Sequence, residues 1–375
     1  MELSELQQIR KYLHAHPELS GKEFSTQEYL KDLLSTLNFF KLIKVGGTGL
    51  AVFFKGTEPG PKLMFRTEID ALPIQEKNSF DHRSKTKGVS HKCGHDGHCS
   101  ILIGLSDYLS SAQNFKGEIC LLFQPAEETG KGAELVLNDE KFEFEPDFVF
   151  ALHNLPGFEK GKIISRTGSF TASVQSLILR FEGSTSHASE PEKGVNPGLC
   201  IAETISFSSS LNFQEVHSDD FALVTLVHSV LGEKAYGVSA GYGELHFTLR
   251  SWSNVKTEEL TAKIISKAMD LCNFYGLKLN FEILEKFEAT INSQEAFDFV
   301  KKAADNLGLT FEEIETPFRF GEDFGLFTNK FQGAMFGLGA GISTPALHAE
   351  DYDYPDEITP VGLNMFKEIV TITQS

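Results

Sequence analysis

The sequence is short of basic residues relative to acidic ones. Its 375 residues include 34 lysines and arginines but 52 aspartates and glutamates, and the formal net charge is −18. A chain with this excess of negative charge repels phosphate backbones and anionic lipid head groups. We therefore expect neither a nucleic acid nor a membrane among its partners.

Long hydrophobic runs and a cysteine framework are also missing. Apolar runs such as residues 148–152 are too short to span a bilayer, and the first five residues show no basic region and no signal-type apolar core. The chain has only 5 cysteines, an odd number without the spacing of a disulfide scaffold. These absences predict a cytoplasmic protein whose thiols stay reduced.

What the sequence does contain is a regular alternation of strands and helices. Helical spacing of leucines and isoleucine predicts a helix at the start of the chain, and the capping box Ser25-Thr26-Gln27-Glu28 predicts the start of a second helix. Apolar runs at residues 50–55, 62–68, 117–123 and 147–152 are typical of strands. This order favours an α/β domain with a mostly parallel sheet covered by helices on both faces.

The pattern changes after about residue 170. Four predicted strands and two predicted helices follow in the order β-α-β-β-α-β: residues 174–181, 196–211, 221–231, 242–250, 257–274 and 278–284. That order is the ferredoxin-like unit. We therefore predict a first domain of residues 1–171 and 285–375, with an inserted α+β domain of residues 172–284.

One stretch concentrates residues that bind metals. Residues 90–98 contain three histidines, one cysteine and one aspartate. Two of these residues, Cys93 and His95, lie two positions apart in a glycine-containing loop. A thiolate and an imidazole at this spacing can bind one transition metal or bridge two. The alternative is a buried cysteine beside a structural histidine.

Further residues of the same chemistry follow later strands. Glu127 and Glu128 come after residues 117–123, His153 comes directly after residues 148–152, and His348 lies in a later loop. The carboxyl ends of parallel strands are where α/β sheets bind ligands. The coincidence favours a metal pair that activates water, with one of the two adjacent glutamates as ligand and the other as general base.

A second pair of histidines has two interpretations. His14 and His16 end the first predicted helix, in His14-Ala15-His16-Pro17-Glu18. They indicate either a solvated helix end or a role at the site, and the spacing alone does not decide between them.

Taken together, these motifs resemble the amidohydrolase branch of the aminoacylase and carboxypeptidase metallopeptidases, peptidase family M-twenty, which includes hippurate hydrolase and N-acetyl-diaminopimelate deacetylase. The resemblance runs nearly from end to end. Its motifs, in order, are His14-x-His16-Pro17-Glu18-Leu19-Ser20, Asp70-Ala71-Leu72-Pro73, Cys93-Gly94-His95-Asp96-Gly97-His98, Phe123-Gln124-Pro125-Ala126-Glu127-Glu128, His153-Asn154, Ser186-His187-Ala188, Gly321-Glu322-Asp323-Phe324 and Leu347-His348.

The resemblance implies a zinc-peptidase-like fold and a role for each residue. Two divalent ions (Zn, Mn, Co or Ni) would be held by Cys93, His95, Glu128, His153 and His348. Glu127 would be the general base, and Asp70 would be a further catalytic residue that orients a ligand. The inserted domain would be a lid that forms a homodimer. Its His187 would stabilise the oxyanion, and Arg250, Asn154 and His187 would contact a small N-acyl amino acid whose amide bond is hydrolysed.

Two positions depart from the family pattern. Arg66-x-Glu68-x-Asp70 replaces the usual R-x-D-x-D, and Gly237-Val238-Ser239-Ala240 replaces an Asn-Val-Ile-Pro run. These departures keep other hypotheses open: a catalytically weakened binding or regulatory protein on this fold, or a peptidase that cleaves short dipeptides. A third hypothesis is a hydrolase that uses Cys93 as nucleophile.

Overall fold

The computed structural model describes residues 1–112 and 115–374 of the chain. These residues form two compact units. The first unit contains Met1–Phe170, Thr290–Glu315 and Glu322–Ser375, and the second contains Thr171–Ala289 and Thr316–Gly321. The second unit is therefore inserted into the first along the chain.

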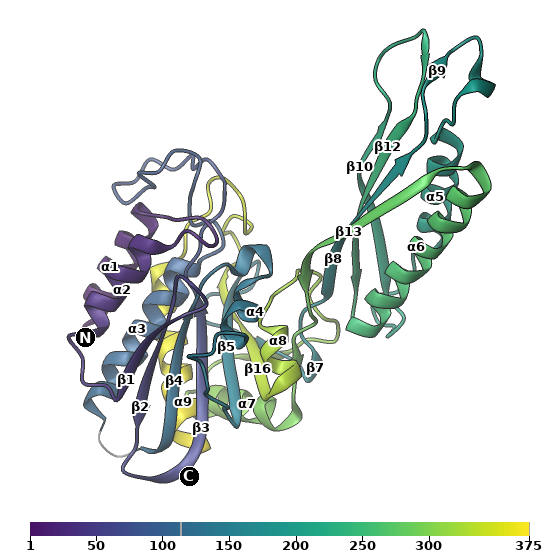
Figure 1. Ribbon diagram of the computed structural model, residues 1–375. Helices are drawn as coiled ribbons and strands as arrows, with labels where there is room; N and C mark the ends of the chain where they lie inside the picture. The colour runs from purple at the N-terminus through teal and green to yellow at the C-terminus, as the bar shows by residue number, and fades with distance from the viewer. Residues whose placement is uncertain (113–114, 375) are drawn as a thin grey trace. The chain divides into compact units, whose positions relative to one another are not determined.

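A mixed eight-stranded sheet is the centre of the first unit (Figure 1). The central pairs β4–β3, β3–β5 and β5–β16 are parallel, and antiparallel pairs occur nearer the edges. In sheet order the strands are β1 (Lys41–Val45), β2 (Gly49–Lys55), β4 (Lys116–Gln124), β3 (Glu58–Glu68), β5 (Phe148–Pro156), β16 (Gln332–Gly341), β6 (Ile163–Ser165) and β15 (Phe311–Glu313). A short separate pair joins β7 (Gly168–Ser169) and β14 (Ile291–Asn292).

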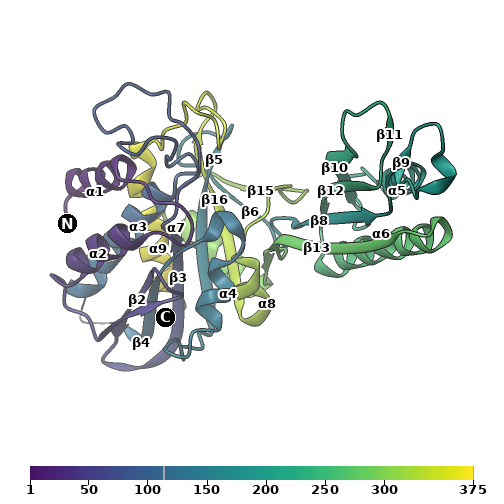
Figure 2. The same cartoon turned by 45° about the horizontal axis from the view of Figure 1, so that its top comes forward.

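Helices cover both faces of this sheet, as expected for buried parallel strands (Figure 2). On one face lie α1 (Leu3–Ala15), α2 (Phe24–Leu34), α3 (His95–Ser111), α7 (Gln294–Asn306) and α9 (Thr359–Thr373). On the other face, α4 (Gly132–Leu137) packs against α8 (Gly325–Lys330). The main core lies between the sheet and the first of these helix layers, where alternate strand residues such as Phe65, Phe150 and Phe336 are fully buried.

The second unit is built around a four-stranded antiparallel sheet. Its elements follow the predicted β-α-β-β-α-β order: β8 (Ser173–Glu182), α5 (Gly198–Ser210), β10 (Ala222–Leu231), β12 (Tyr242–Ser251), α6 (Asn254–Tyr275) and β13 (Lys278–Phe287). Along β12, buried and half-buried residues alternate because α5 and α6 cover only one face. A short antiparallel pair joins β9 (Ser186–His187) and β11 (Val238–Ser239).

The prediction of a capping box at residues 25–28 is wrong. Helix α2 begins earlier, at Phe24, and no side chain of the box caps it. Instead, the Glu18 carboxylate accepts hydrogen bonds from the backbone amides of Ser25 (3.2 Å) and Thr26 (2.8 Å). A carboxylate from outside the helix thus satisfies the free amides of the first turn.

Within the described ranges, none of the helices combines the length and the apolar character of a membrane span.

Candidate metal centre

Five ligand-type side chains gather where parallel strands of the large sheet end. They come from the loop before α3, the start of α3, the short 3-10 helix after β4 (Glu127–Thr129), the end of β5 and the loop after β16. Those residues are Cys93, His95, Glu128, His153 and His348. The structure therefore brings together every residue that the sequence predicts as a ligand.

The five side chains form two groups that share Cys93. Ligand atoms of Cys93, His95 and His153 lie within 4.8 Å of one another, and so do those of Cys93, Glu128 and His348. A thiolate common to both groups can bridge two cations. Sulfur, imidazole nitrogen and carboxylate oxygen together suit divalent transition metals.

Two buried polar atoms face each other between these groups without a hydrogen bond. His95 Nε2 and Glu128 Oε1 lie 3.9 Å apart, and neither has a hydrogen-bond partner among the described residues. Buried polar atoms normally have such partners. A cation would satisfy both atoms, so the residues present fit a metal site.

Asp70 fixes the orientation of His95. The Nδ1 atom of His95 donates to the Asp70 carbonyl at 3.0 Å and lies 3.3 Å from Asp70 Oδ1. Asp70 Oδ2 in turn accepts from the Ser20 hydroxyl and the Glu128 backbone amide. With Nδ1 occupied in this way, His95 presents Nε2 to the site, as a metal ligand requires.

His153 is held in a comparable way. Its Nδ1 donates to the Asn154 carbonyl at 2.9 Å, and its Nε2 lies 3.5 Å from Cys93 Sγ. Burial lowers the pKa of His153 to about 3, so the ring is neutral at physiological pH. A neutral imidazole is the form that binds metals.

Glu127 lies beside the ligand groups. Its Oε2 is 3.8 Å from His95 Nε2, and its carboxylate is close to Glu322 and Asp323. Burial, followed by repulsion from Glu322 and Glu128, raises the pKa of Glu127 well above its usual value. A carboxylate in this environment holds a proton more readily than an exposed glutamate does.

The turn that carries Glu127 and Glu128 contains an unusual backbone conformation. Ala126 has a φ of 53°, in the left-handed region that costs an alanine about 1–2 kcal/mol. The buried Glu23 carboxylate accepts from the Ala126 amide at 2.8 Å and from the Thr48 hydroxyl. Such outside support maintains a strained turn at a functional site.

The environment of Cys93 argues against a nucleophilic cysteine. Burial, followed by the negative charges of Glu128 and Glu127, raises the pKa of the Cys93 thiol well above its usual value. A nucleophilic cysteine needs a lowered pKa. A thiolate at this position instead requires a cation to compensate its charge.

Several residues of the centre were not assigned a role from the sequence. Arg66 is fully buried and forms ion pairs with Glu68, with Glu322 (2.9 Å) and with Asp323 (2.6 Å). Glu68 also accepts from His98 Nδ1 at 2.9 Å. The sequence offered two indications that these residues belong to the centre. Arg66 and Glu68 lie close to Asp70 in the chain, and Glu322-Asp323 belong to a family motif.

Asn154 is buried at the end of β5. Its side-chain amide donates to the Tyr352 hydroxyl at 2.8 Å, and its backbone amide donates to His98 Nε2 at 3.1 Å. The structure thus places this predicted substrate contact between His98 and Tyr352.

The two remaining predicted residues belong to the second unit. His187 is exposed in β9, with Nδ1 2.7 Å from the Ser189 hydroxyl. Arg250 is half-buried in β12 and donates to the Arg319 carbonyl at 2.5 Å.

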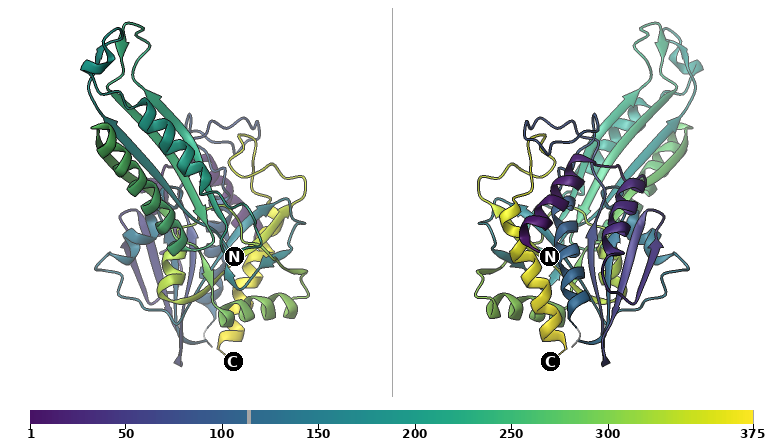
Figure 3. Two further views of the ribbon diagram at one scale, coloured as in Figure 1. Left: turned by 90° about the vertical axis from the view of Figure 1, so that its right-hand side faces the viewer. Right: turned by 90° about the vertical axis from the view of Figure 1, so that its left-hand side faces the viewer.

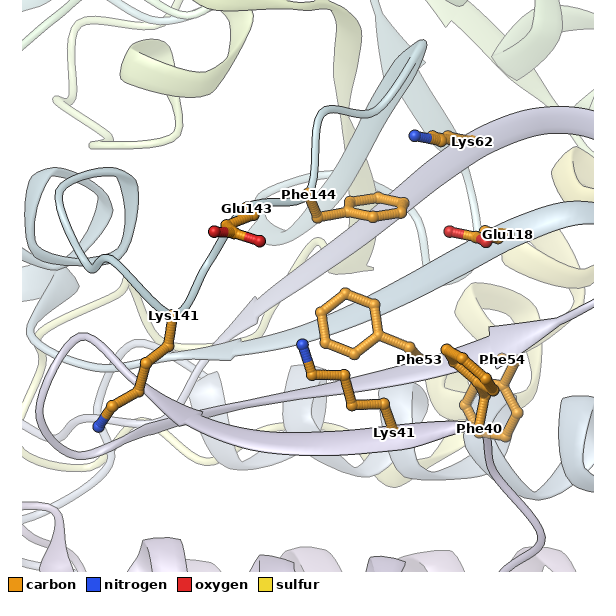
Figure 4. Close-up of a pocket in the computed structure, with 9 residues that line it drawn as sticks. All are labelled: Phe40, Lys41, Phe53, Phe54, Lys62, Glu118, Lys141, Glu143 and Phe144. Atoms are coloured by element: carbon orange, nitrogen blue, oxygen red, sulfur yellow. The ribbon is translucent and has the colours of Figure 1, made fainter.

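A surface hollow elsewhere on the first unit contains none of these residues (Figure 4). It has a volume of about 180 Å³ and is lined by Phe40, Lys41, Phe53, Phe54, Lys62, Glu118, Lys141, Glu143 and Phe144. Lys62 and Glu118 lie in the first halves of β3 and β4, away from the strand ends where the ligands gather.

Comparison with known proteins places the chain in a family. The model of peptidase family M20/M25/M40 matches residues 64–371. The chain belongs to this family. As an M20 member it is a hydrolase that acts on amide bonds, which confirms the prediction from the sequence.

Individual relatives agree with this placement. The N-acetyldiaminopimelate deacetylase of Lactobacillus helveticus (strain DPC 4571) is 32% identical over 377 residues, covering 97% of this chain and 96% of the relative. The hippurate hydrolase of Campylobacter jejuni subsp. jejuni is 31% identical over 360 residues, covering 94% and 92%. These names confirm the amidohydrolase branch of the M20 family.

A solved structure shows the same fold. The Bacillus subtilis YXEP protein, described as a dinuclear metal binding peptidase from the M20 family, superposes with a TM-score of 0.84. It is 26% identical, and the match covers 99% of this chain and 97% of that protein. The predicted α/β fold class is thereby confirmed.

Proposed function

We propose that this M20 family member is a metal-dependent amidohydrolase that cleaves the amide bond of N-acyl amino acids. One observation supports it above all: two three-residue ligand groups share Cys93, and the Glu127 carboxylate lies 3.8 Å from a ligand atom of His95. The relatives support the substrate class, because N-acetyldiaminopimelate and hippurate are both N-acyl amino acids.

In this proposal, Cys93, His95 and His153 would hold one divalent ion, and Cys93, Glu128 and His348 would hold a second. The donor set is compatible with Zn, Mn, Co or Ni. Such a pair would polarise the acyl carbonyl and lower the pKa of the attacking water.

Glu127 is the proposed general base. Its carboxylate accepts a proton from the attacking water and then donates it to the leaving nitrogen of the amino acid. The raised pKa of Glu127 favours the first step, because a carboxylate with a raised pKa is a stronger base. Asp70 assists by orienting His95.

Arg250 and His187 are the proposed substrate contacts of the second unit. The Arg250 guanidinium donates to a neutral carbonyl, so its positive charge remains available to a substrate carboxylate. His187 is exposed, and its proposed role is to stabilise the oxyanion from across a homodimer formed by the second units. Asn154 is the third proposed contact, although its side-chain amide donates to Tyr352.

The proposed location is the cytoplasm. All five cysteines are buried, and none of them forms a disulfide. Reduced thiols in this number are typical of a reducing compartment.

The test is amide hydrolysis on a panel of N-acetyl, N-benzoyl and N-succinyl amino acids. Each substrate is assayed with the protein as purified, after chelation, and after adding back Zn²⁺, Mn²⁺, Co²⁺ or Ni²⁺. We expect a chelator to abolish hydrolysis and one metal to restore it. Hydrolysis that survives complete metal removal would overturn the mechanism, and a metal-loaded protein inactive on the whole panel would favour a binding role.

A further inference from the structure

The two histidines at the end of α1 have different environments. The His14 side chain is 0% exposed, whereas His16 is half-buried and contacts the Tyr12 carbonyl and Lys85. The alternative of a solvated helix end therefore fails for His14. This residue needs another explanation.

His14 lies between two carboxylates. Its Nδ1 donates to Asp96 Oδ2 at 2.8 Å, and its Nε2 donates to Glu76 Oε1 at 3.0 Å. Both ring nitrogens act as donors only in the imidazolium form. Burial by itself lowers the pKa of His14, but the hydrogen bonds to Asp96 and Glu76 outweigh it and raise the pKa to about 9.

Glu76 connects His14 to a second buried cation. Lys92 Nζ donates to Glu76 Oε1 at 2.5 Å and to the Tyr352 carbonyl at 2.7 Å, and Lys92 is 0% exposed. The other oxygen of Glu76 accepts from the Ser84 amide at 2.6 Å. We call His14, Glu76, Lys92 and Asp96 the His14 network.

The His14 network touches three proposed ligands through the backbone. Asp96 directly follows His95, and Lys92 directly precedes Cys93. The Lys92 carbonyl also accepts from the His348 amide at 2.7 Å. A displacement of Lys92 or Asp96 would therefore displace proposed ligands of both three-residue groups.

We propose that His14 is a positioning residue, which holds Cys93 and His95, and through Lys92 also His348, at the spacing that two cations require. The inference rests on the proposed metal centre, since it assigns a role in shaping that centre. The inference gives His14, a residue of α1 that is not itself a proposed ligand, a role in orienting the ligands.

The energetics favour this role over simple stabilisation. Removing charged groups from water costs several kcal/mol per ion, and buried ion pairs often contribute no more to stability than apolar side chains of the same size. Four buried charged groups are thus a poor way to stabilise a fold. They do define one arrangement of the segments that carry them, because each group requires its partner at a fixed place.

The experiment measures Co²⁺ binding by the full chain. Wild type, His14→Gln and Lys92→Met are compared with His16→Gln, the matched control from the same motif. Affinity is determined by competition with a chromophoric chelator at a temperature where circular dichroism shows each protein folded. The thiolate-to-cobalt absorption band reports separately whether Cys93 is a ligand, and hydrolysis of N-acyl amino acids is assayed on the same samples.

We expect His14→Gln and Lys92→Met to bind Co²⁺ about tenfold more weakly, with a changed absorption band, as is typical when the support of a ligand is removed. His16→Gln should match wild type.

If both network variants are folded and bind Co²⁺ within twofold of wild type, the inference is wrong even if N-acyl substrates are cleaved. If His14→Gln does not fold, Lys92→Met decides alone. Weaker binding in the variants without hydrolysis by wild type would uphold the positioning role and reject the proposed reaction.

Discussion

Gly94 lies so close to Asn154 that a Cβ atom on Gly94 would be 1.9 Å from Asn154 Oδ1. Gly94 also has a φ of 96°, in the left-handed region, and it separates the two proposed ligands Cys93 and His95. The loop that carries these ligands therefore requires glycine for two independent reasons.

Replacing Gly94 with alanine should destabilise the protein and weaken metal binding. The left-handed backbone costs about 1–2 kcal/mol for alanine, and overpacking against Asn154 adds about 1–3 kcal/mol. Gly21→Ala is the control, because Gly21 has a φ of 73° but nothing within 4 Å of its would-be Cβ. Urea denaturation of the two variants should differ by the overpacking cost, and equal losses of stability would contradict the proposed clash.

Glu127→Gln should abolish most of the turnover while leaving metal binding intact. General acid–base catalysis contributes about a hundredfold to ten-thousandfold to a rate, so kcat should fall by a factor in that range. Metal content is measured on the same samples by atomic emission. The control is Glu134→Gln, an exposed glutamate on α4. A Glu127→Gln protein that turns over at the wild-type rate would remove Glu127 from the mechanism.

Arg66→Met should be among the most destabilising substitutions in the first unit. It leaves the buried carboxylates of Glu68, Glu322 and Asp323 without the guanidinium that compensates them. Breaking a buried ion pair from one side costs about 3–5 kcal/mol. Urea denaturation measures the loss, and Lys31→Met, which removes an exposed pair with Glu28, should have little effect. Similar stabilities for the two variants would show that Arg66 is dispensable.

The contribution of His14 to stability should depend on pH. Its pKa is raised from the ordinary 6.5 to about 9 by the hydrogen bonds to Asp96 and Glu76, against the opposing effect of burial. The stabilisation is therefore complete below pH 6.5 and is lost as the pH rises through 9. The pH-dependent part is on the order of 3 kcal/mol.

This dependence is measured as the difference in the free energy of unfolding between wild type and His14→Gln, from pH 6 to pH 10. The difference should shrink as the pH rises. A constant difference over this range would mean that His14 is not charged in the folded protein.

The sequence could indicate where the proposed ligands gather because several of its signals are local, whereas the choice of Glu128 as ligand and Glu127 as base came from the family resemblance. Apolar runs mark the strands, and Cys93, Glu128 and His153 each lie beside such a run or in a distinctive loop. Since parallel strands end at one edge of the sheet, local predictions were sufficient to bring these residues together.

The supports of the site could not be predicted in the same way. Arg66 and Asp323 are 257 residues apart, so no local pattern indicates their ion pair. The capping box failed for a related reason: Glu18, outside the predicted box, caps α2 in its place. Burial of His14 likewise depends on partners from distant segments.

The first helix depends on residues far along the chain. Arg10 donates to Asp356 and Asp353, which are 346 and 343 residues later in the chain, and α1 lies on the same face as α9 (Figure 3). Proteins emerge from the ribosome with the N-terminus first. The nascent chain therefore lacks these two partners of Arg10, and also the proposed ligand His348, until residues 348–356 have been made. The arrangement of α1 and of the proposed ligands therefore forms only after residues 348–356 have been synthesised.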